Sequence, residues 1–589
     1  MLKIKLRMDH SFYFILLAVF VKCLLAQTDL PERNFGPSKG RIPIDYYEKI
    51  MNCLEENDKS ATKYFCKLAI NHFLDDDSPL PKNIYGIFRD ENGNDVAPLY
   101  RSHEGCDDLM YALLQGVKRY PEDIDFQNYY EKILDYADAM LEFATDRYGN
   151  IKSPLLASIL TRDPVPKVPE DPDHPGHGVR IKKHNVYSYD KDGIKNNWVA
   201  VGVGNIWYGS NESHKSSWHG TDLAQDEKLY DLLYELSALT ENSKYRNAAA
   251  ASLEFWLANC STETHLFPWG EHSGWNFFTE HYDQGWYHSR YHEFDGGEGM
   301  YDKFIEHQPR VKTGELTVME KFALAHVSTS IGRILDGKLQ GMFVYGRHQP
   351  LWAYRDSAAI EDADLKEFGN FPRIAGSILY SQAFAYNRSN NPDFKESVVK
   401  HMNLIADGLE EQRSRLGVGF YPYLYPVSSK GTFDTFKNYQ NNRLGVNAMR
   451  AAFLMKQANA CKTIIDKLIA IGKATGKDKP VVVESYYGPS MVTGVIPENK
   501  SMISDSIVTL SWTQTERADS YHIYVSEHAD DLRTANTNSP CFVGNTSDTH
   551  CSLAHLEPEK QYFWSVDAVG KAAIRKGEIN SIWIKTAHP

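Results

Sequence analysis

The sequence predicts a mainly α-helical protein followed by a shorter all-β region. From about residue 40 to 475, apolar residues recur every three or four positions, in pairs of segments separated by short polar or Gly/Pro breaks. From residue 480 onward the chain instead has short runs in which apolar and polar residues alternate. With 589 residues and 42% hydrophobic content, the chain can build a large core, and its length allows more than one domain.

Residues 1–26 have the layout of a signal peptide. A basic start is followed by an apolar run over residues 12–25, which is shorter than the about 20 residues that a membrane-spanning helix needs. No later run is apolar for that long. We therefore expect a secreted, extracellular glycoprotein without a membrane span. Five Asn-x-Ser/Thr glycosylation sites agree with this route: Asn211, Asn259, Asn387, Asn499 and Asn545.

Seven cysteines remain after the signal peptide. Export makes disulfide bonds favourable, and the closest pairs along the chain are Cys53 with Cys66 and Cys541 with Cys551. No Cys-x-x-Cys pair occurs, which argues against a thioredoxin-like site and against a cysteine-ligated zinc ribbon.

The formal net charge of −13 argues against nucleic acid as a partner. The same acidity argues against a polyanionic substrate, unless lysines and arginines are gathered locally in one cleft.

The helical region contains two well-defined examples of its repeating pattern. In the segment 126–141 the apolar residues form one helix face after an acidic start. The segments 227–240 and 244–259 are joined so tightly that two helices there must be antiparallel. Similar helical segments are expected at 44–53, 61–73, 107–120, 316–335, 371–385, 394–409 and 444–471.

About ten helices in successive hairpins favour an α/α toroid over residues 27–477, with helix-to-helix loops lining an open mouth. The Pro-rich stretch 161–178 cannot be helical and is expected to be a surface loop. Residues 198–210 alternate like a short strand pair that contributes to the rim.

In the region 478–589, four runs read as strands at the spacing of a β-sandwich: 506–512, 520–526, 561–569 and 581–586. Trp512 lies at the end of the run 506–512, and Leu556 lies six positions before Tyr562. This pattern resembles that of a fibronectin type III domain. The resemblance implies an extracellular setting and contacts with matrix proteins, and it says little about chemistry.

The segment 265–293 holds five of the 22 histidines and three of the 11 tryptophans. Tryptophan faces stack on sugar rings, and imidazoles beside carboxylates transfer protons near neutral pH. We interpret this segment as the floor of a binding cleft. The alternative is a buried cluster of aromatic and histidine side chains that satisfy one another.

Three short stretches carry the strongest chemical signal: WGEH (269–272), YHEF (291–294) and FVYGRH (343–348). Together with DRYGNIKSPLLAS (146–158) and the helix pair at 229–257, they resemble exported, pectate-lyase-like proteins of the α/α-toroid class. The resemblance implies an enzyme that cleaves a polysaccharide containing uronic acids, and therefore a polysaccharide lyase acting by β-elimination.

Elimination needs a base, a cation that stabilises the developing negative charge, and an acid that protonates the leaving oxygen. We predict His272 or His292 as the base, Tyr345 as the acid and Arg347 as the clamp for the substrate carboxylate. For Arg347 a structural ion pair is an equal alternative. The predicted substrate-binding residues are Trp269, Trp275, Trp286, Glu271, Glu293, His348, Trp218 and His219.

Two other classes of function stay open. A glycoside hydrolase would use paired carboxylates about 5–9.5 Å apart, for which Glu271 with Glu293 or Asp222 with Asp226 are candidates. A matrix or glycan-binding protein would keep the toroid without catalysis. No cofactor is expected; His288 and His292, four positions apart beside Glu293, leave a divalent metal open. The absence of GxSxG, HExxH and phosphate-loop patterns argues against a lipase, a metalloprotease and a kinase.

Overall fold

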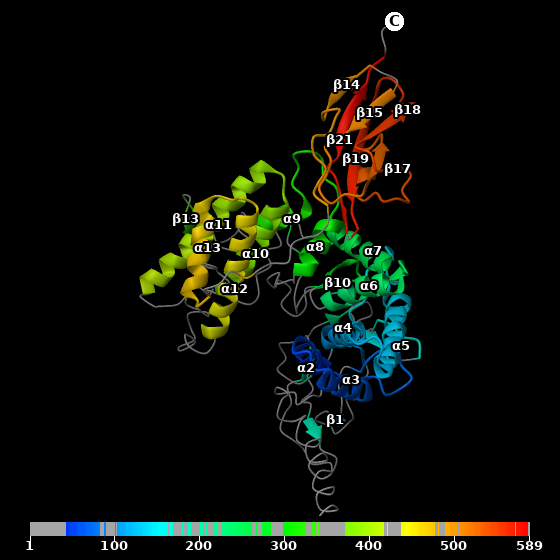
Figure 1. Cartoon of the computed structure of the whole chain (residues 1–589), viewed down its shortest axis with the longest axis vertical. Coiled ribbons are helices and arrows are strands. Elements are labelled where there is room, and N and C mark those ends of the chain that lie inside the picture. Colours follow the sequence, from blue (N-terminus) through cyan, green and yellow to red (C-terminus); the bar gives the residue numbers. More distant parts are fainter. Residues whose placement is uncertain are drawn as a thin grey trace, which may run out of the picture. The chain divides into compact units, whose positions relative to one another are not determined.

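The computed structural model describes part of the chain, which is coloured in Figure 1. The described residues are 43–82, 87–89, 100–101, 103–162, 164–168, 179–180, 187–189, 201–203, 206–208, 217–218, 220–221, 223, 226–261, 265, 267, 274–283, 298–325, 333–335, 338–340, 372–416, 421, 437–477, 481, 489–504, 507–571 and 573–586. They belong to two compact units, the first made of 1–144, 158–218 and 228–235, and the second of 145–157, 219–227 and 236–589.

The first unit is built on four helices: α2 (Pro43–Glu55), α3 (Lys59–Phe73), α4 (His103–Arg119) and α5 (Ile124–Ala139), the last continued by a π-helical turn, η1 (Met140–Ala144). Helix α2 packs against α3 and α4, and α4 packs against α5. Asp58 starts α3 by accepting a hydrogen bond from the backbone N of Ala61 at 2.9 Å, which satisfies one of the open donors of the first turn.

Short antiparallel strand pairs complete the described part of this unit. They are β1 (Ile87–Arg89) with β5 (Tyr187–Tyr189), β2 (Tyr100–Arg101) with β3 (Leu160–Thr161), β4 (Val179–Arg180) with β8 (Ser217–Trp218), and β6 (Val201–Val203) with β7 (Ile206–Tyr208). The pair β6–β7 confirms the strand pair expected within 198–210.

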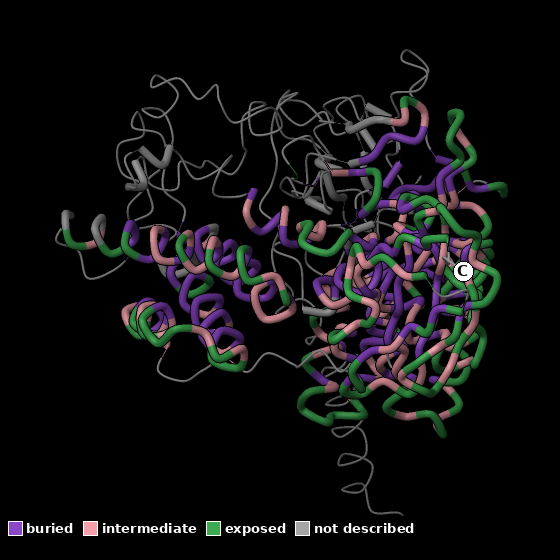
Figure 2. The backbone as a smooth tube through the Cα atoms, turned by 90° about the horizontal axis from the view of Figure 1, so that it is seen from above, coloured by how far each residue is buried: buried purple, intermediate pink, exposed green. Residues whose placement is uncertain are grey.

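The second unit contains most of the remaining helices: α7 (Lys244–Asn259), α8 (Glu298–His307), α9 (Val318–Ala325), α10 (Pro372–Arg388), α11 (Pro392–Leu416), α12 (Lys437–Gln457) and α13 (Lys462–Ala474). Helix α6 (Glu227–Thr240) contributes residues to both units. Helix α10 packs on α12, and α12 packs on α13. A Cβ at Gly376 would lie 2.9 Å from the Cα of Leu444, so α10 and α12 approach closely because residue 376 is glycine. Along these helices buried and exposed stretches alternate, as Figure 2 shows.

One helix prediction is wrong in part. The helical segment expected at 316–335 contains α9, which ends at Ala325, but residues Arg333–Leu335 form strand β12 paired with β13 (Lys338–Gln340). The helical segment expected at 444–471 is confirmed; it comprises parts of α12 and α13, which are separated by a turn in which Asn459 has a φ of 53°. Asparagine tolerates this left-handed conformation, so it ends α12 where glycine is usual.

The C-terminal part of the second unit has two sheets that share one core. Among the described residues, one sheet has the order β14 (Ser501–Ile503), β21 (Asn580–Ile584), β19 (Lys560–Val569), β16 (Ser520–Ser526) and β17 (Phe542–Thr546), with β20 (Ile574–Arg575) on β19. The other pairs β15 (Ile507–Ser511) with β18 (His550–Ala554). Val508, Leu510 and Leu553 from the small sheet meet Ile523, Trp564 and Ile582 from the large one.

The hydroxyl of Tyr562 accepts a hydrogen bond from the backbone N of Glu557 at 3.0 Å. A tyrosine bonded to the backbone a few residues upstream is typical of immunoglobulin-like sandwiches, so this contact supports the assignment of 478–589 to the fibronectin type III class. That assignment and the α/α toroid over 27–477 stay proposals.

The expected disulfide bonds are not formed. Cys53, Cys66, Cys541 and Cys551 are all thiols in the structure. Cys541 and Cys551 pack against different core clusters of the β region. They therefore do not form a disulfide bond although they are only ten positions apart in the sequence. Burial raises the pKa of the Cys53 thiol and of the Cys551 thiol, and so disfavours the thiolate that disulfide exchange requires.

The predicted glycosylation sites differ in exposure. Asn259 at the end of α7 and Asn545 on β17 are exposed, whereas Asn387 and Asn499 are half-buried and bonded to neighbouring groups. Asn211 lies outside the described residues. Within the part of the chain that the structure describes, no helix combines the length and the apolar character needed to cross a bilayer.

Candidate functional site

Most of the predicted site residues lie outside the described part of the chain, and Trp275 is the predicted residue whose side chain the structure places. Trp218 is on strand β8, with only its backbone described. The others outside the described residues are His272, His292, Tyr345, Arg347, Trp269, Trp286, Glu271, Glu293, His348 and His219, together with His288 and Asp222. Asp226, from the hydrolase alternative, is fully buried at the start of α6.

Trp275 lies on the middle strand of a three-stranded antiparallel sheet, with the order β11 (His281–Asp283), β10 (Gly274–Asn276) and β9 (Gly220–Thr221). Its side chain is 8% exposed, and its ring meets Phe255 of α7 edge-on at 6.4 Å. A Cβ at Gly220 would overlap the backbone oxygen of Trp275, so the close approach of β9 depends on glycine. The indole therefore anchors the sheet to α7, and its predicted contact with substrate stays a prediction.

The turn between β10 and β11 is held by Asn276, which is 2% exposed. Its side-chain oxygen accepts hydrogen bonds from the backbone N of Phe278 at 2.8 Å and of Thr279 at 3.1 Å, which is an Asx turn. Glu280 follows with a φ of 54°, and its carboxylate accepts hydrogen bonds from the backbone N of Asn150 and Ile151. The hairpin is thus tied to the 146–153 stretch, which the resemblance to pectate lyases also includes.

The 146–153 stretch forms its own compact loop around Asp146, which is 4% exposed. One carboxylate oxygen accepts from the backbone N of Tyr148 at 2.9 Å, and the other accepts from the backbone N and the hydroxyl of Ser153 at 3.0 and 2.7 Å. Burial raises the pKa of the Asp146 carboxyl against the effect of these bonds. The ring of Tyr148 lies 4.5 Å from that of Phe278, so loop and hairpin also share an aromatic contact.

These contacts describe a scaffold in the middle of the His- and Trp-rich segment 265–293. His272 stands two positions before β10, and the chain leaves β11 at Asp283 toward His292. Because the buried polar groups Asn276 and Asp146 bond within the scaffold, we assign them to positioning and not to chemistry. Among the described residues, no three His, Cys, Asp or Glu side chains gather as a metal site would require.

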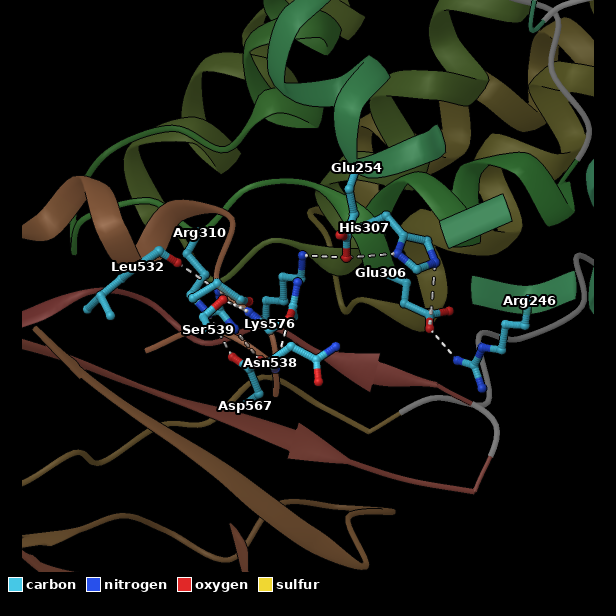
Figure 3. A network of polar contacts seen from close by, with 12 residues as sticks. Arg246, Glu254, Glu306, His307, Arg310, Leu532, Asn538, Ser539, Asp567 and Lys576 are labelled. Carbon is cyan, nitrogen blue, oxygen red and sulfur yellow. Dashed lines mark hydrogen bonds and ion pairs between the residues drawn. The ribbon is translucent and has the colours of Figure 1, made fainter. Parts of the chain in front are cut away.

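A second polar cluster, which no sequence pattern indicated, joins α7 and α8 to the C-terminal β region (Figure 3). His307, 5% exposed, has Nδ1 3.5 Å from a carboxylate oxygen of Glu254 and Nε2 3.8 Å from one of Glu306. Glu254 also pairs with Lys576 at 3.1 Å, and Glu306 pairs with Arg246 at 2.6 Å. Each of the two glutamates therefore has a cationic partner, Lys576 for Glu254 and Arg246 for Glu306, and His307 lies between them.

Arg310, just after α8, makes the most buried ion pair of this junction. Its Nε and Nη2 donate to the two carboxylate oxygens of Asp567 at 3.0 and 2.5 Å, and both side chains are at most 2% exposed. Nη1 donates to the backbone oxygens of Leu532 and Ala535 at 2.7 and 2.8 Å, and the guanidinium lies 4.3 Å from the centre of the Tyr524 ring. Backbone bonds between Ile579 and the segment 311–313 continue the contact.

The charge of Glu254 should stabilise this junction in a pH-dependent way. Although burial disfavours the carboxylate, the bond to His307 and the charge of Lys576 lower the pKa of Glu254 from 4.5 to about 2. The pKa of Glu254 is lower in the folded protein than in the unfolded chain, so the ionised carboxylate stabilises the fold by roughly 2–3 kcal/mol. This stabilisation is complete above about pH 5 and is lost as the pH falls toward about 2. We expect Glu254→Gln to be less stable than wild type in urea at pH 7, with the difference closing in acid. A difference that does not change between pH 7 and pH 3 would contradict this assignment.

The comparisons with known proteins agree with the sequence-based class. Residues 205–354 match the model of a family described as periplasmic pectate lyase. This stretch spans less than half of the chain and includes the segment 265–293, the β9–β11 sheet and helices α7, α8 and α9. It is therefore similar to pectate lyases, which act on an acidic polysaccharide.

Solved structures also match a short part of the chain. The "Structure of FN3tt mut" is 18% identical, covering 16% of this chain and 92% of that chain with a TM-score of 0.12. "The crystal structure of a Fn3-like protein from Clostridium thermocellum" is 14% identical, covering 17% of this chain and 98% of that chain with a TM-score of 0.13. No curated protein sequence matches the chain.

Proposed function

We propose that this protein is a secreted polysaccharide lyase that cleaves a uronic-acid-containing extracellular polysaccharide by β-elimination. The observation that carries the proposal is the pectate lyase match over 205–354, because it contains His272, His292, Tyr345 and Arg347. The roles of these four residues follow from the chemistry that such a substrate requires.

In the proposed reaction, His272 or His292 removes the proton on the carbon next to the carboxylate of a uronic acid. The electron pair of that bond forms a carbon–carbon double bond, and the bond to the glycosidic oxygen breaks. Tyr345 donates a proton to the leaving oxygen, and Arg347 stabilises the charge that builds up on the carboxylate. The products are a new chain end and an unsaturated uronate.

The described scaffold supports this reaction by fixing the chain on either side of the turn that Asn276 holds. The Asx turn, the Glu280 bonds to the 150–151 backbone and the packing of Trp275 on Phe255 tie the β10–β11 hairpin to its neighbours.

A panel of polymers tests the proposal. Pectin, alginate and glycosaminoglycans are each incubated with the full chain, and ultraviolet absorbance and reducing ends are followed together. A lyase produces both signals on at least one acidic polymer. New reducing ends without absorbance would show a glycoside hydrolase, and retention of polymer without either signal would show a glycan-binding protein; both results would overturn the proposal.

A further inference from the structure

We propose that a groove beside the C-terminal β region is a second binding site for the anionic polysaccharide, apart from the segment that carries the predicted chemistry. The groove has a volume of about 580 Å³ and is open to solvent. It lies where the ends of α10 and α12 meet the segment 489–493 and the turn 514–517 between β15 and β16. The inference rests on the proposed function for the class of ligand.

The groove gathers three arginines, Arg388, Arg517 and Arg575, with one acidic residue, Glu516, whereas the whole chain has a formal charge of −13. Arg388 is paired with Asp302, so Arg517 and Arg575 supply the positive charge that a ligand would meet. A local gathering of arginines is what an acidic protein needs in order to hold a polyanion. Guanidinium groups also bind carboxylates in two places at once, so uronic acid units are a better match than neutral sugars.

The remaining lining suits sugar hydroxyls. It is made of amides and hydroxyls: Asn387, Asn390, Gln457, Ser490, Thr493, Gln514 and Thr515. Side chains of this kind both donate and accept hydrogen bonds, and the volume lies in the range of small-ligand sites. The groove therefore has the charge, the polarity and the size for a short stretch of an acidic polysaccharide.

The arginines differ in how firmly the fold holds them. Arg388 pairs with Asp302 at 3.3 Å and lies over the Phe384 ring, and Arg575 donates to the backbone oxygen of Arg388 at 2.7 Å. Arg517 is exposed, and its φ of 61° places it in the left-handed region that side-chain-bearing residues rarely adopt. Arg517 is therefore the groove arginine that a ligand in solvent reaches without breaking a contact of the fold.

Arg517→Glu tests the proposal, with Lys500→Glu as the matched control. Lys500 is in the same C-terminal region, is exposed and also has a positive φ of 67°, but it does not line the groove. Both variants lower the net charge by the same amount. Any general electrostatic effect on a polyanion therefore appears in both.

The measurement is calorimetric titration of the full-length, unglycosylated protein with a galacturonate trimer and with a neutral trisaccharide. Unglycosylated protein is used because Asn387 lines the groove and is a predicted glycosylation site. To separate the two sites, the titration is done in the His272→Ala, Arg347→Ala background, which removes a predicted base and the predicted carboxylate clamp of the other site. We expect trimer binding to a site that Arg517→Glu weakens about tenfold and Lys500→Glu leaves unchanged, since a hydrogen bond to a charged group is lost.

Equal trimer affinities of the two charge-reversal variants would overturn the proposal, and so would equal binding of the neutral trisaccharide. This result is independent of the lyase assay. If Arg517→Glu weakens trimer binding but the protein forms no unsaturated product, the binding site in the groove is supported and the proposed lyase function is wrong. If the protein forms unsaturated product but Arg517→Glu does not change trimer binding, only the binding site in the groove is wrong.

Discussion

Arg310→Met should destabilise the protein by roughly 3–5 kcal/mol, which is the usual cost of removing one partner of a buried ion pair. The substitution leaves the Asp567 carboxylate inside the protein with no opposing charge, although Gly577 still donates to it at 3.0 Å. It also removes the guanidinium nitrogen that donates hydrogen bonds to the backbone oxygens of Leu532 and Ala535. The change in free energy of unfolding is measured by urea denaturation at pH 7.

Arg533→Met is the matched control, because Arg533 is a neighbouring arginine at the same junction. Its pair with Glu315 is longer, at 3.5 Å, and both side chains are about one-third exposed or more. Exposed pairs of this kind contribute at most about 1 kcal/mol. A double variant, Arg310→Met with Asp567→Leu, should recover part of the loss, because it leaves no buried charge. If Arg310→Met is no less stable than Arg533→Met, the junction is not held by this ion pair.

His272→Ala and His292→Ala should separate the two candidate bases. The residue that acts as the base is expected to lower kcat by about 10²–10⁴-fold, the usual contribution of general base catalysis. Arg347→Lys should also lower kcat, by about 10²–10³-fold, because an ammonium cannot hold the carboxylate in two places as the charge develops. Initial rates of unsaturated product formation on the polymer identified by the panel provide the measurement.

His265→Asn is the control for these variants. His265 lies in the same segment 265–293, is exposed, and has a φ of 65°, a conformation that asparagine tolerates. Its substitution should leave the rate unchanged. Full activity of both His272→Ala and His292→Ala would remove the proposed base from this segment.

Individual helices and strands were predictable where a local pattern of apolar and polar residues determines them. Alternation of apolar and polar residues placed a strand at 520–526, and β16 has these bounds because its inward residues face one shared core. The break between α12 and α13 was missed because Asn459 replaces the glycine that usually marks such a turn. Helix α8 was missed because its apolar positions, such as Phe304 and Ile305, are few and follow a glycine-rich stretch.

For the candidate site, the sequence indicates only a segment. The density of tryptophan and histidine indicated the segment 265–293, and the pectate lyase match includes all of it. The contacts that hold this region were not predictable, because they join residues far apart in the sequence. Glu280 bonds to residues about 130 positions earlier, and Arg310 pairs with a residue 257 positions later. A carboxylate in a turn has the same local sequence whether it is solvated or bonded to a distant loop.

The most direct test of the central claim is the mass of the oligosaccharides released from an acidic polymer such as polygalacturonate. β-Elimination predicts that each released oligosaccharide with a new non-reducing end is lighter by one water than the corresponding product of hydrolysis. We also expect these unsaturated products to be absent with the His272→Ala, His292→Ala double variant. Products of full hydrolytic mass, or unsaturated products that persist in that variant, would contradict it.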